Sequence, residues 1–150
     1  MDRKKSNLAS DVYVVENRNA RPEPAHVLLA EDDSEFRSIL SSALRARGYL
    51  VTECADGLEL AINVAPAGSV EGEQEYDLVI SDIRMPGMFG LSVLEGLHQL
   101  DDAPPVILIT AFGDEETHAH ANELGAAAVL DKPFHIRDLL AKVDEILDSD

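Results

Sequence analysis

The chain alternates between short apolar runs and longer segments in which apolar residues recur with a helical period. After a polar stretch that ends in the breaker-rich RPEPAH, the run HVLLA stops at three acids and predicts a buried strand. From Phe36 to Leu44, apolar residues lie three and four positions apart, which is typical of one face of an amphipathic helix. Asp33 or Ser34 can cap the start of this helix, and Gly48 can end it.

This pair of elements is followed by four more of the same kind. Further strands are predicted at YLVTECA, DLVIS, PPVILIT and GAAAVL, and further helices at GLELAINVA, LSVLEGLHQL, DEETHAHANEL and 136–147. Alternating strands and helices favour a parallel sheet with helices on both faces. We therefore predict an α/β fold, a doubly wound (βα)5 domain whose five-stranded parallel sheet has the order 2-1-3-4-5. Residues 26–150 are expected to form this domain, and residues 1–25 a flexible N-terminal tail or linker.

Charge is strongly negative and unevenly spread. The formal net charge is −17, and residues 1–25 hold five basic residues against four acids, which leaves seven against 25 in residues 26–150. Such an acidic surface repels the phosphates of nucleic acid and anionic lipid, so we expect no direct binding of either. Cys54 is the only cysteine, which excludes a disulfide framework. With no apolar run of ~18 residues and no signal-type apolar core, a cytoplasmic protein is expected.

Polar residues at the predicted strand ends supply the candidate chemistry. In the order 2-1-3-4-5, ligands bind at the carboxyl ends of strands 1 and 3, where the strand order reverses. Glu31 and Asp32 follow the first strand and Asp82 ends the third, so three carboxylates are expected to meet there. Because they repel one another, a divalent cation is needed to hold them together. All-oxygen ligands without histidine or cysteine indicate Mg²⁺.

Two more polar residues reach the same edge. Thr110 ends the fourth strand and Lys132 follows the fifth. A hydroxyl group and an ammonium group can hold the oxygens of a phosphoryl group while Mg²⁺ neutralises the remaining charge. An aspartate in such a pocket can accept the phosphoryl group and form an acyl phosphate.

The motifs LLAEDD, LVISDIRMPG, ILITA and DKPF stand in this order at the ends of four predicted strands. With them, residues 26–147 resemble a receiver domain of the bacterial two-component response regulators, which have the CheY-like, flavodoxin-like fold. The resemblance implies that Asp82 is the phosphoacceptor and takes its phosphoryl group from a sensor histidine kinase or a phosphotransfer protein. It also implies that Mg²⁺ is bound by Asp82, by Asp32, by Glu31 directly or through water, and by the backbone carbonyl of Arg84.

The resemblance extends to the rest of the pocket. It implies that Thr110 hydrogen-bonds the phosphoryl group and that Lys132 pairs with one of its oxygens. The bond between Lys132 and Pro133 is expected to be cis, which would direct the lysine inward. Positions 84 and 112 tune hydrolysis in the family, so the large ring of Phe112 predicts a long-lived phosphorylated state.

The switch position departs from the family pattern. Val129 stands where receiver domains usually carry a switch Tyr or Phe, and a valine has no ring that could swing inward. The activation signal is therefore expected to travel through the loop after Thr110, or to be weak.

Three hypotheses about function remain open. The first is a phosphoacceptor signalling module, which is not an enzyme except that it catalyses its own phosphorylation and dephosphorylation. The second is a Mg²⁺-dependent aspartyl-phosphate phosphatase or phosphotransferase, and the third is an interaction module that no longer depends on phosphorylation. For the first, the expected partners are the kinase and a downstream protein target or a missing effector domain. A homodimer through the face of the fourth helix, fifth strand and fifth helix is also expected.

Overall fold

The computed structural model of the chain describes residues 24–64, 76–85, 88–98, 103–111 and 115–148. Three expectations lie wholly or partly outside these residues: the tail over 1–25, apart from its last two residues, the loop after Thr110 beyond Ala111, and the ring of Phe112. Ala25, at the end of that tail, is buried, and its backbone carbonyl accepts a hydrogen bond of 2.9 Å from the amide of Leu50. Ala25 therefore packs with the folded part of the chain.

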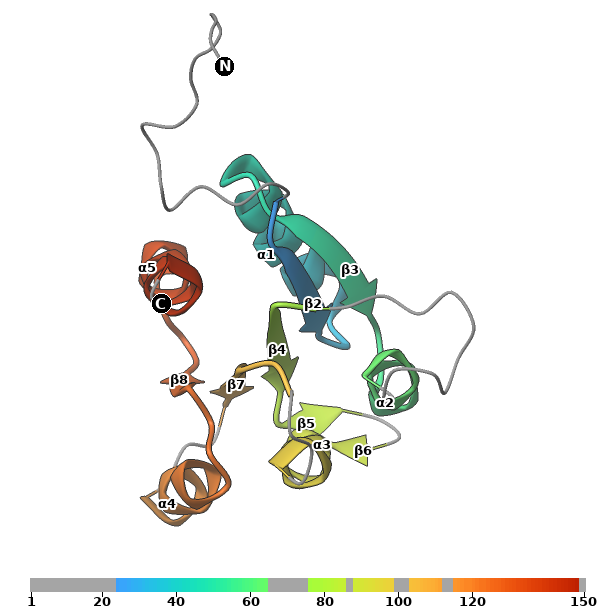
Figure 1. Cartoon of the computed structure of the whole chain (residues 1–150), viewed down its shortest axis with the longest axis vertical. Coiled ribbons are helices and arrows are strands. Elements are labelled where there is room, and N and C mark those ends of the chain that lie inside the picture. The colour runs from blue at the N-terminus through green and yellow to red at the C-terminus, as the bar shows by residue number, and fades with distance from the viewer. Residues whose placement is uncertain (1–23, 65–75, 86–87, 99–102, 112–114, 149–150) are drawn as a thin grey trace, which may run out of the picture.

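Five parallel strands form one sheet, and their order confirms the prediction from the sequence (Figure 1). In sheet order they are β3 (Leu50–Cys54), β2 (His26–Ala30), β4 (Leu78–Asp82), β7 (Val106–Thr110) and β8 (Ala128–Asp131). In the register of the sheet, Val27 of β2 lies between Val51 of β3 and Leu78 of β4. All five residues of β4 and of β7 are buried, as expected for central strands covered on both faces.

Helices cover the sheet on both faces, and each face has its own apolar core (Figure 1). The helices are α1 (Ser34–Ala46), α2 (Gly57–Asn63), α3 (Gly90–His98), α4 (Glu115–Glu123) and α5 (Ile136–Asp148). Along β2, Val27 and Leu29 pack with α1 and α5, because side chains alternate between the two faces of a strand. Leu28, between them, packs on the face of α2, α3 and α4. No helix in the described ranges has the length and apolarity that a membrane span requires.

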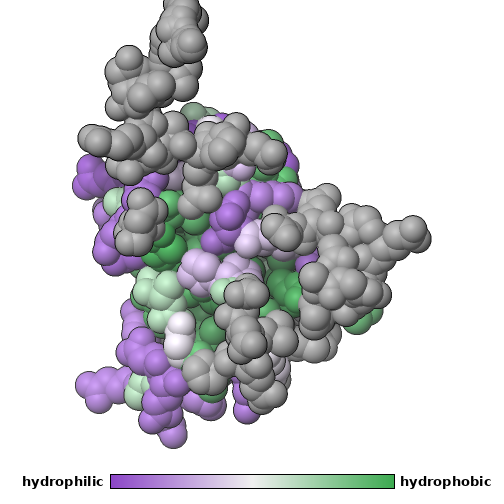
Figure 2. All heavy atoms as spheres, viewed as in Figure 1, coloured by the Kyte–Doolittle hydropathy of each residue, from purple (hydrophilic) through white to green (hydrophobic). Residues whose placement is uncertain are grey.

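The helix α4 is only lightly anchored to its core. Ala121 is the one buried residue of α4, and hydrophilic side chains gather over this helix (Figure 2). Gly125 follows with a φ of 89°, which places the end of α4 at a residue that tolerates the left-handed conformation. The strand predicted from Gly125 onward therefore begins three residues later, at Ala128.

The turn between β2 and α1 is fixed by a helix cap. The side chain of Asp33 accepts hydrogen bonds of 3.0 Å from the backbone amides of Glu35 and Phe36, as a helix N-cap does. Glu31 and Asp32 lie in this turn, directly after the last residue of β2. The cap therefore holds the two acids at the carboxyl edge of the sheet.

A short hairpin follows β4. It pairs β5 (Arg84–Met85) with β6 (Met88–Phe89) in antiparallel register, and α3 begins directly after it. The hydrophobic pattern indicated only a turn here, because two-residue strands are too short to show an alternation.

Candidate metal centre

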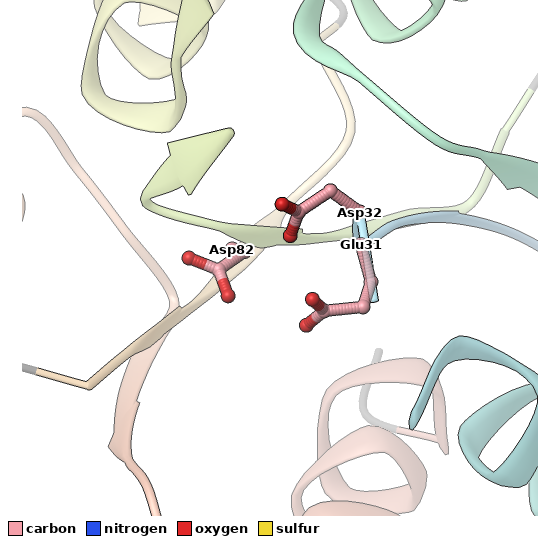
Figure 3. Close-up of side chains that lie close together, drawn as sticks. All are labelled: Glu31, Asp32 and Asp82. Atoms are coloured by element: carbon pink, nitrogen blue, oxygen red, sulfur yellow. The ribbon is translucent and has the colours of Figure 1, made fainter. Parts of the chain in front are cut away.

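Three carboxylates from two strand ends converge at the carboxyl edge of the sheet. Glu31 and Asp32 extend from the end of β2 and Asp82 from the end of β4, and all three turn toward a common space (Figure 3). One oxygen from each carboxylate lies within 4.8 Å of the other two. Oxygens bound to one Mg²⁺ at ~2.1 Å lie about 3 to 4 Å apart. A small rotation of the side chains, or one bridging water, is therefore enough for this set to fit the ion.

Glu31 is almost fully buried, with 1% of its surface exposed. One carboxylate oxygen, Oε2, accepts a hydrogen bond of 3.1 Å from the amide of Asp33, and the other, Oε1, lies 3.3 Å from Lys132 Nζ. Burial raises the pKa of Glu31 to about 7, and the charge of Asp82 adds to this effect, although the Asp33 amide and Lys132 oppose it. A cation that binds here would therefore compete with a proton near neutral pH.

Asp82 is buried at the end of β4, and both of its carboxylate oxygens have partners. Oδ1 accepts a hydrogen bond of 2.9 Å from the backbone amide of Arg84, and Oδ2 accepts one of 2.9 Å from Lys132 Nζ. An ionised carboxylate at a buried strand end would be costly without such partners. The ammonium of Lys132 therefore compensates the charge of Asp82 in this structure.

Lys132 reaches the acids from the end of β8. Burial by itself lowers the pKa of this lysine, but the hydrogen bond and charge of Asp82 and the charge of Glu31 outweigh it, so the pKa is raised. The side chain consequently stays cationic at neutral pH. The backbone amide of Lys132 donates a hydrogen bond of 2.8 Å to the carbonyl of Thr110, and the bond between Lys132 and Pro133 is cis.

Three other predicted site residues lie on β7, β5 and β8. Thr110 is buried at the end of β7, the strand that pairs with β4 beside Asp82. Arg84 begins β5, two residues after Asp82, and its side chain is exposed. Val129 is half-buried in β8, where it pairs with Leu108 and packs on the core beneath α4.

Sequence reasoning missed two aromatic residues next to the lysine. The ring centroid of Phe36 lies 4.9 Å from Lys132 Nζ, and the rings of Phe36 and Phe134 meet edge to face with centroids 5.9 Å apart. The hydrophobic pattern assigns Phe36 only to the apolar stripe of its helix. A partial signal was present, because Phe36 occupies the first turn after the acids and Phe134 belongs to the motif DKPF.

Arg37 is a third residue that sequence reasoning missed, and it stabilises the turn between β2 and α1. Arg37 Nη1 donates a hydrogen bond of 2.6 Å to the backbone carbonyl of Glu31, and its Nε lies 3.2 Å from Glu53 Oε1 on β3. The turn that bears Glu31 and Asp32 is therefore tied to both α1 and the neighbouring strand.

The family model and the curated relatives that match this chain agree on one family. The model of the response regulator receiver domain matches residues 27–144. The transcriptional activator protein PfeR of Pseudomonas aeruginosa is 39% identical over 129 residues, which cover 84% of this chain and 38% of PfeR. The response regulator receiver protein CpdR of Brucella abortus is 33% identical over 121 residues, which cover 81% of this chain and 95% of CpdR.

Solved structures agree with this. The CheY-like receiver domain protein of Methanospirillum hungatei superposes with a TM-score of 0.73 at 29% identity, over 84% of this chain and 95% of that protein. The chain spans half or less of several curated relatives that it matches, among them PfeR. The similarity therefore concerns one domain of those longer proteins.

Proposed function

Because the chain belongs to the response regulator receiver domain family, we propose that it accepts a phosphoryl group on Asp82 in a Mg²⁺-dependent reaction. The phosphodonor is the phosphohistidine of a sensor histidine kinase or of a phosphotransfer protein. The observation that carries the proposal is the convergence of Asp82 with two further acids and one lysine at a single sheet edge. Phosphorylation then switches a surface that binds another protein.

The donor set suits a hard cation. In the proposed site Mg²⁺ would be held by Asp32 and Asp82, by Glu31 directly or through water, and by the backbone carbonyl of Arg84. Oxygen ligands of this kind are those that Mg²⁺ prefers. When bound, the ion neutralises charge on the carboxylates and on the incoming phosphoryl oxygens.

The residues of the chain divide the remaining tasks. A carboxylate oxygen of Asp82 forms the new bond to phosphorus while the bond from phosphorus to the donor nitrogen breaks, and the leaving imidazole keeps that electron pair and takes a proton from water. Lys132, which now pairs with Asp82, moves its ammonium to a phosphoryl oxygen, and Thr110 donates its hydroxyl to another. Catalysis in this scheme is positioning and charge compensation, and the only chemistry is the protein's own phosphorylation and dephosphorylation.

The output is part of the proposal. Several longer relatives are named as transcriptional regulators and CpdR as a receiver protein, which supports either a joined effector domain or a separate protein target. We place the switching surface, and a homodimer contact, on the face of α4, β8 and α5. Since Val129 replaces the usual aromatic switch, the loop after Thr110 carries the signal, and Phe112 shields the acyl phosphate from water.

The test is the mass of the intact protein after incubation with acetyl phosphate, with and without Mg²⁺. Wild type should gain one phosphoryl group only with Mg²⁺, and Asp82→Asn should gain none. Asp56→Asn is the matched control, because asparagine also caps a helix and Asp56, at the cap of α2, is not a proposed ligand. An equal gain in Asp82→Asn would refute the assignment of the phosphoacceptor.

One observation favours a second candidate, an interaction module that is independent of phosphorylation. Val129 is a small side chain packed on the core, so a swing of an aromatic ring at this position is absent from the mechanism. Partner binding that is unchanged in Asp82→Asn would support this candidate. Turnover of small phosphate esters would instead support a phosphatase or phosphotransferase.

A further inference from the structure

Phe36 places an aromatic face against the ammonium of the site lysine. Its ring lies 4.9 Å from Lys132 Nζ, within the range of a cation–π interaction. The same nitrogen is 2.9 Å from Asp82 Oδ2 and 3.3 Å from Glu31 Oε1. The lysine head group is therefore held by two carboxylates from the sheet and by one ring from α1.

The ring itself is held from two sides. The backbone amide of Phe36 donates a hydrogen bond of 3.0 Å to Asp33 Oδ1, which fixes the first turn of α1. The edge-to-face contact with Phe134 joins the ring to the segment that follows Lys132. Asp33 also donates its own amide to Glu31, so one residue positions both a proposed metal ligand and the ring.

We propose that Phe36 is a positioning residue that keeps the ammonium of Lys132 over Asp82 while the lysine exchanges its partners. The inference rests on the proposed function. In that reaction Asp82 becomes an acyl phosphate, and Glu31 and Asp82 would also serve as metal ligands, so both ion pairs of Lys132 change. The contact between the Phe36 ring and the ammonium of Lys132 can stay as it is. The ring belongs to a capped helix, and Phe36 is not one of the proposed metal ligands.

An aliphatic side chain cannot replace the ring in this role. Leucine would still pack on the helix and on the methylene groups of Lys132, whose side chain is 28% exposed. It would offer no negative face to the ammonium, which could then turn out toward water. The expected defect is therefore in the rate of phosphoryl transfer, with the binding of Mg²⁺ left nearly intact.

The experiment compares the full chain with Phe36→Leu and Phe36→Tyr. Initial rates of phosphorylation by acetyl phosphate are measured at saturating Mg²⁺, and Mg²⁺ affinity is measured by calorimetry. We expect Phe36→Leu to be roughly two- to five-fold slower and Phe36→Tyr to stay within about two-fold of wild type, since tyrosine keeps the aromatic face. Ile39→Ala, an exposed position on the same helix, should match wild type and controls for substitutions in α1.

A second readout reports the contact directly. In NMR spectra of wild type, the ε-methylene protons of Lys132 should be shifted upfield by the ring, and Phe36→Leu should abolish that shift while Phe36→Tyr keeps it. Thermal unfolding shows whether each variant is folded. Lys132 protons without an upfield shift in wild type would overturn the proposal.

The kinetic outcomes separate this proposal from the function on which it rests. If wild type takes up a phosphoryl group and Phe36→Leu is equally fast, only the role of Phe36 is refuted. A tyrosine variant as slow as the leucine variant would also refute it, because ring packing rather than the aromatic face would then be decisive. If the Mg²⁺ affinity of Phe36→Leu falls in parallel with its rate, the substitution has disturbed the turn that bears Glu31 and Asp32, and the proposal fails. Wild type that takes up no phosphoryl group would refute the proposed function and this inference together.

Discussion

Glu31 carries a proton-binding group into the interior of the site. Its pKa is raised from 4.5 to about 7, chiefly by burial. Between these two values the folded protein holds a proton that the unfolded chain has lost, so the metal-free fold is favoured at the lower pH. This contribution to stability is complete below pH 4.5 and is lost as the pH rises through about 7.

We therefore predict that Glu31→Gln removes part of the pH dependence of stability. In a chelating buffer, the free energy of unfolding of wild type should fall between about pH 4.5 and about pH 7 relative to that of Glu31→Gln. Urea denaturation at several pH values measures the difference. Glu35→Gln, an exposed acid in the first turn of α1, should behave as wild type. Parallel curves for wild type and Glu31→Gln would contradict the prediction.

At the scale of single residues, the sequence was enough to bring the acids and the lysine together. Glu31, Asp82 and Lys132 follow buried strands, and the carboxyl ends of parallel strands share one edge whatever the details of packing. The contact between Phe36 and Lys132 was not predictable in this way. It depends on the rotation of α1 about its axis and on the rotamers of a long lysine, and neither is specified by apolar periodicity.

Between elements, Asp144 joins α5 to the segment that follows α1. Its Oδ2 accepts a hydrogen bond of 2.7 Å from Arg47 Nη1, and its Oδ1 accepts one of 2.5 Å from the hydroxyl of Tyr49. Burial and this hydrogen bond raise the pKa of Tyr49, so the phenol stays protonated and remains a donor. Helices α1 and α5 cover the same face of the sheet, and these two hydrogen bonds connect them at the border of their shared core.

Loss of this link should destabilise the fold. We expect Tyr49→Phe to lower the free energy of unfolding by about 1 kcal/mol and Asp144→Ala by about 1–2 kcal/mol, because each leaves a partly buried polar partner unpaired. In urea denaturation, the double variant should lose less than the two single losses combined. Glu145→Ala removes only an exposed pair with Lys142 and should cost less than about 0.5 kcal/mol. Additive losses would contradict the proposed coupling.

The order of strands and helices followed from the sequence because apolar runs and amphipathic stripes have different periods. The helix boundary at Asp33 was recognisable from its capping chemistry. The start of β8 was placed too early because GAAAVL is apolar throughout, whereas Gly125 and Ala126 still donate hydrogen bonds to the last turn of α4. The sequence does not predict the pair β5 and β6, because a strand of two residues is too short to show an alternation of apolar and polar positions.

For the molecule as a whole, a net charge of −17 makes a general response to cations inevitable. Monovalent salt screens this charge everywhere, but three carboxylates within 4.8 Å favour one divalent ion at one place. Removing one carboxylate of the site should therefore weaken the specific binding of a divalent ion but leave the general screening by salt almost unchanged.

We predict that Mg²⁺ stabilises the fold beyond the effect of sodium chloride at equal ionic strength. Binding to the folded state alone adds about 2.7 kcal/mol at a concentration about 100 times Kd. Thermal unfolding measures this gain, and Asp32→Asn should abolish most of it. Asp56→Asn, at the cap of α2, keeps its capping ability and should retain the gain. A gain of equal size in Asp32→Asn would mean that Mg²⁺ acts through screening alone.

The ion pair between Lys132 and Glu31 spans 101 positions of the chain. During synthesis, all three acids leave the ribosome before the lysine, and β8, at the edge of the sheet, is the last of its strands along the chain. A nascent or truncated chain that stops before residue 132 has the carboxylates but no ammonium to hold a phosphoryl oxygen. On the proposed mechanism, such a fragment would meet the phosphodonor without reacting productively. On this mechanism, competence to receive a phosphoryl group requires translation past β8, and fragments that end before it do not respond to the phosphodonor.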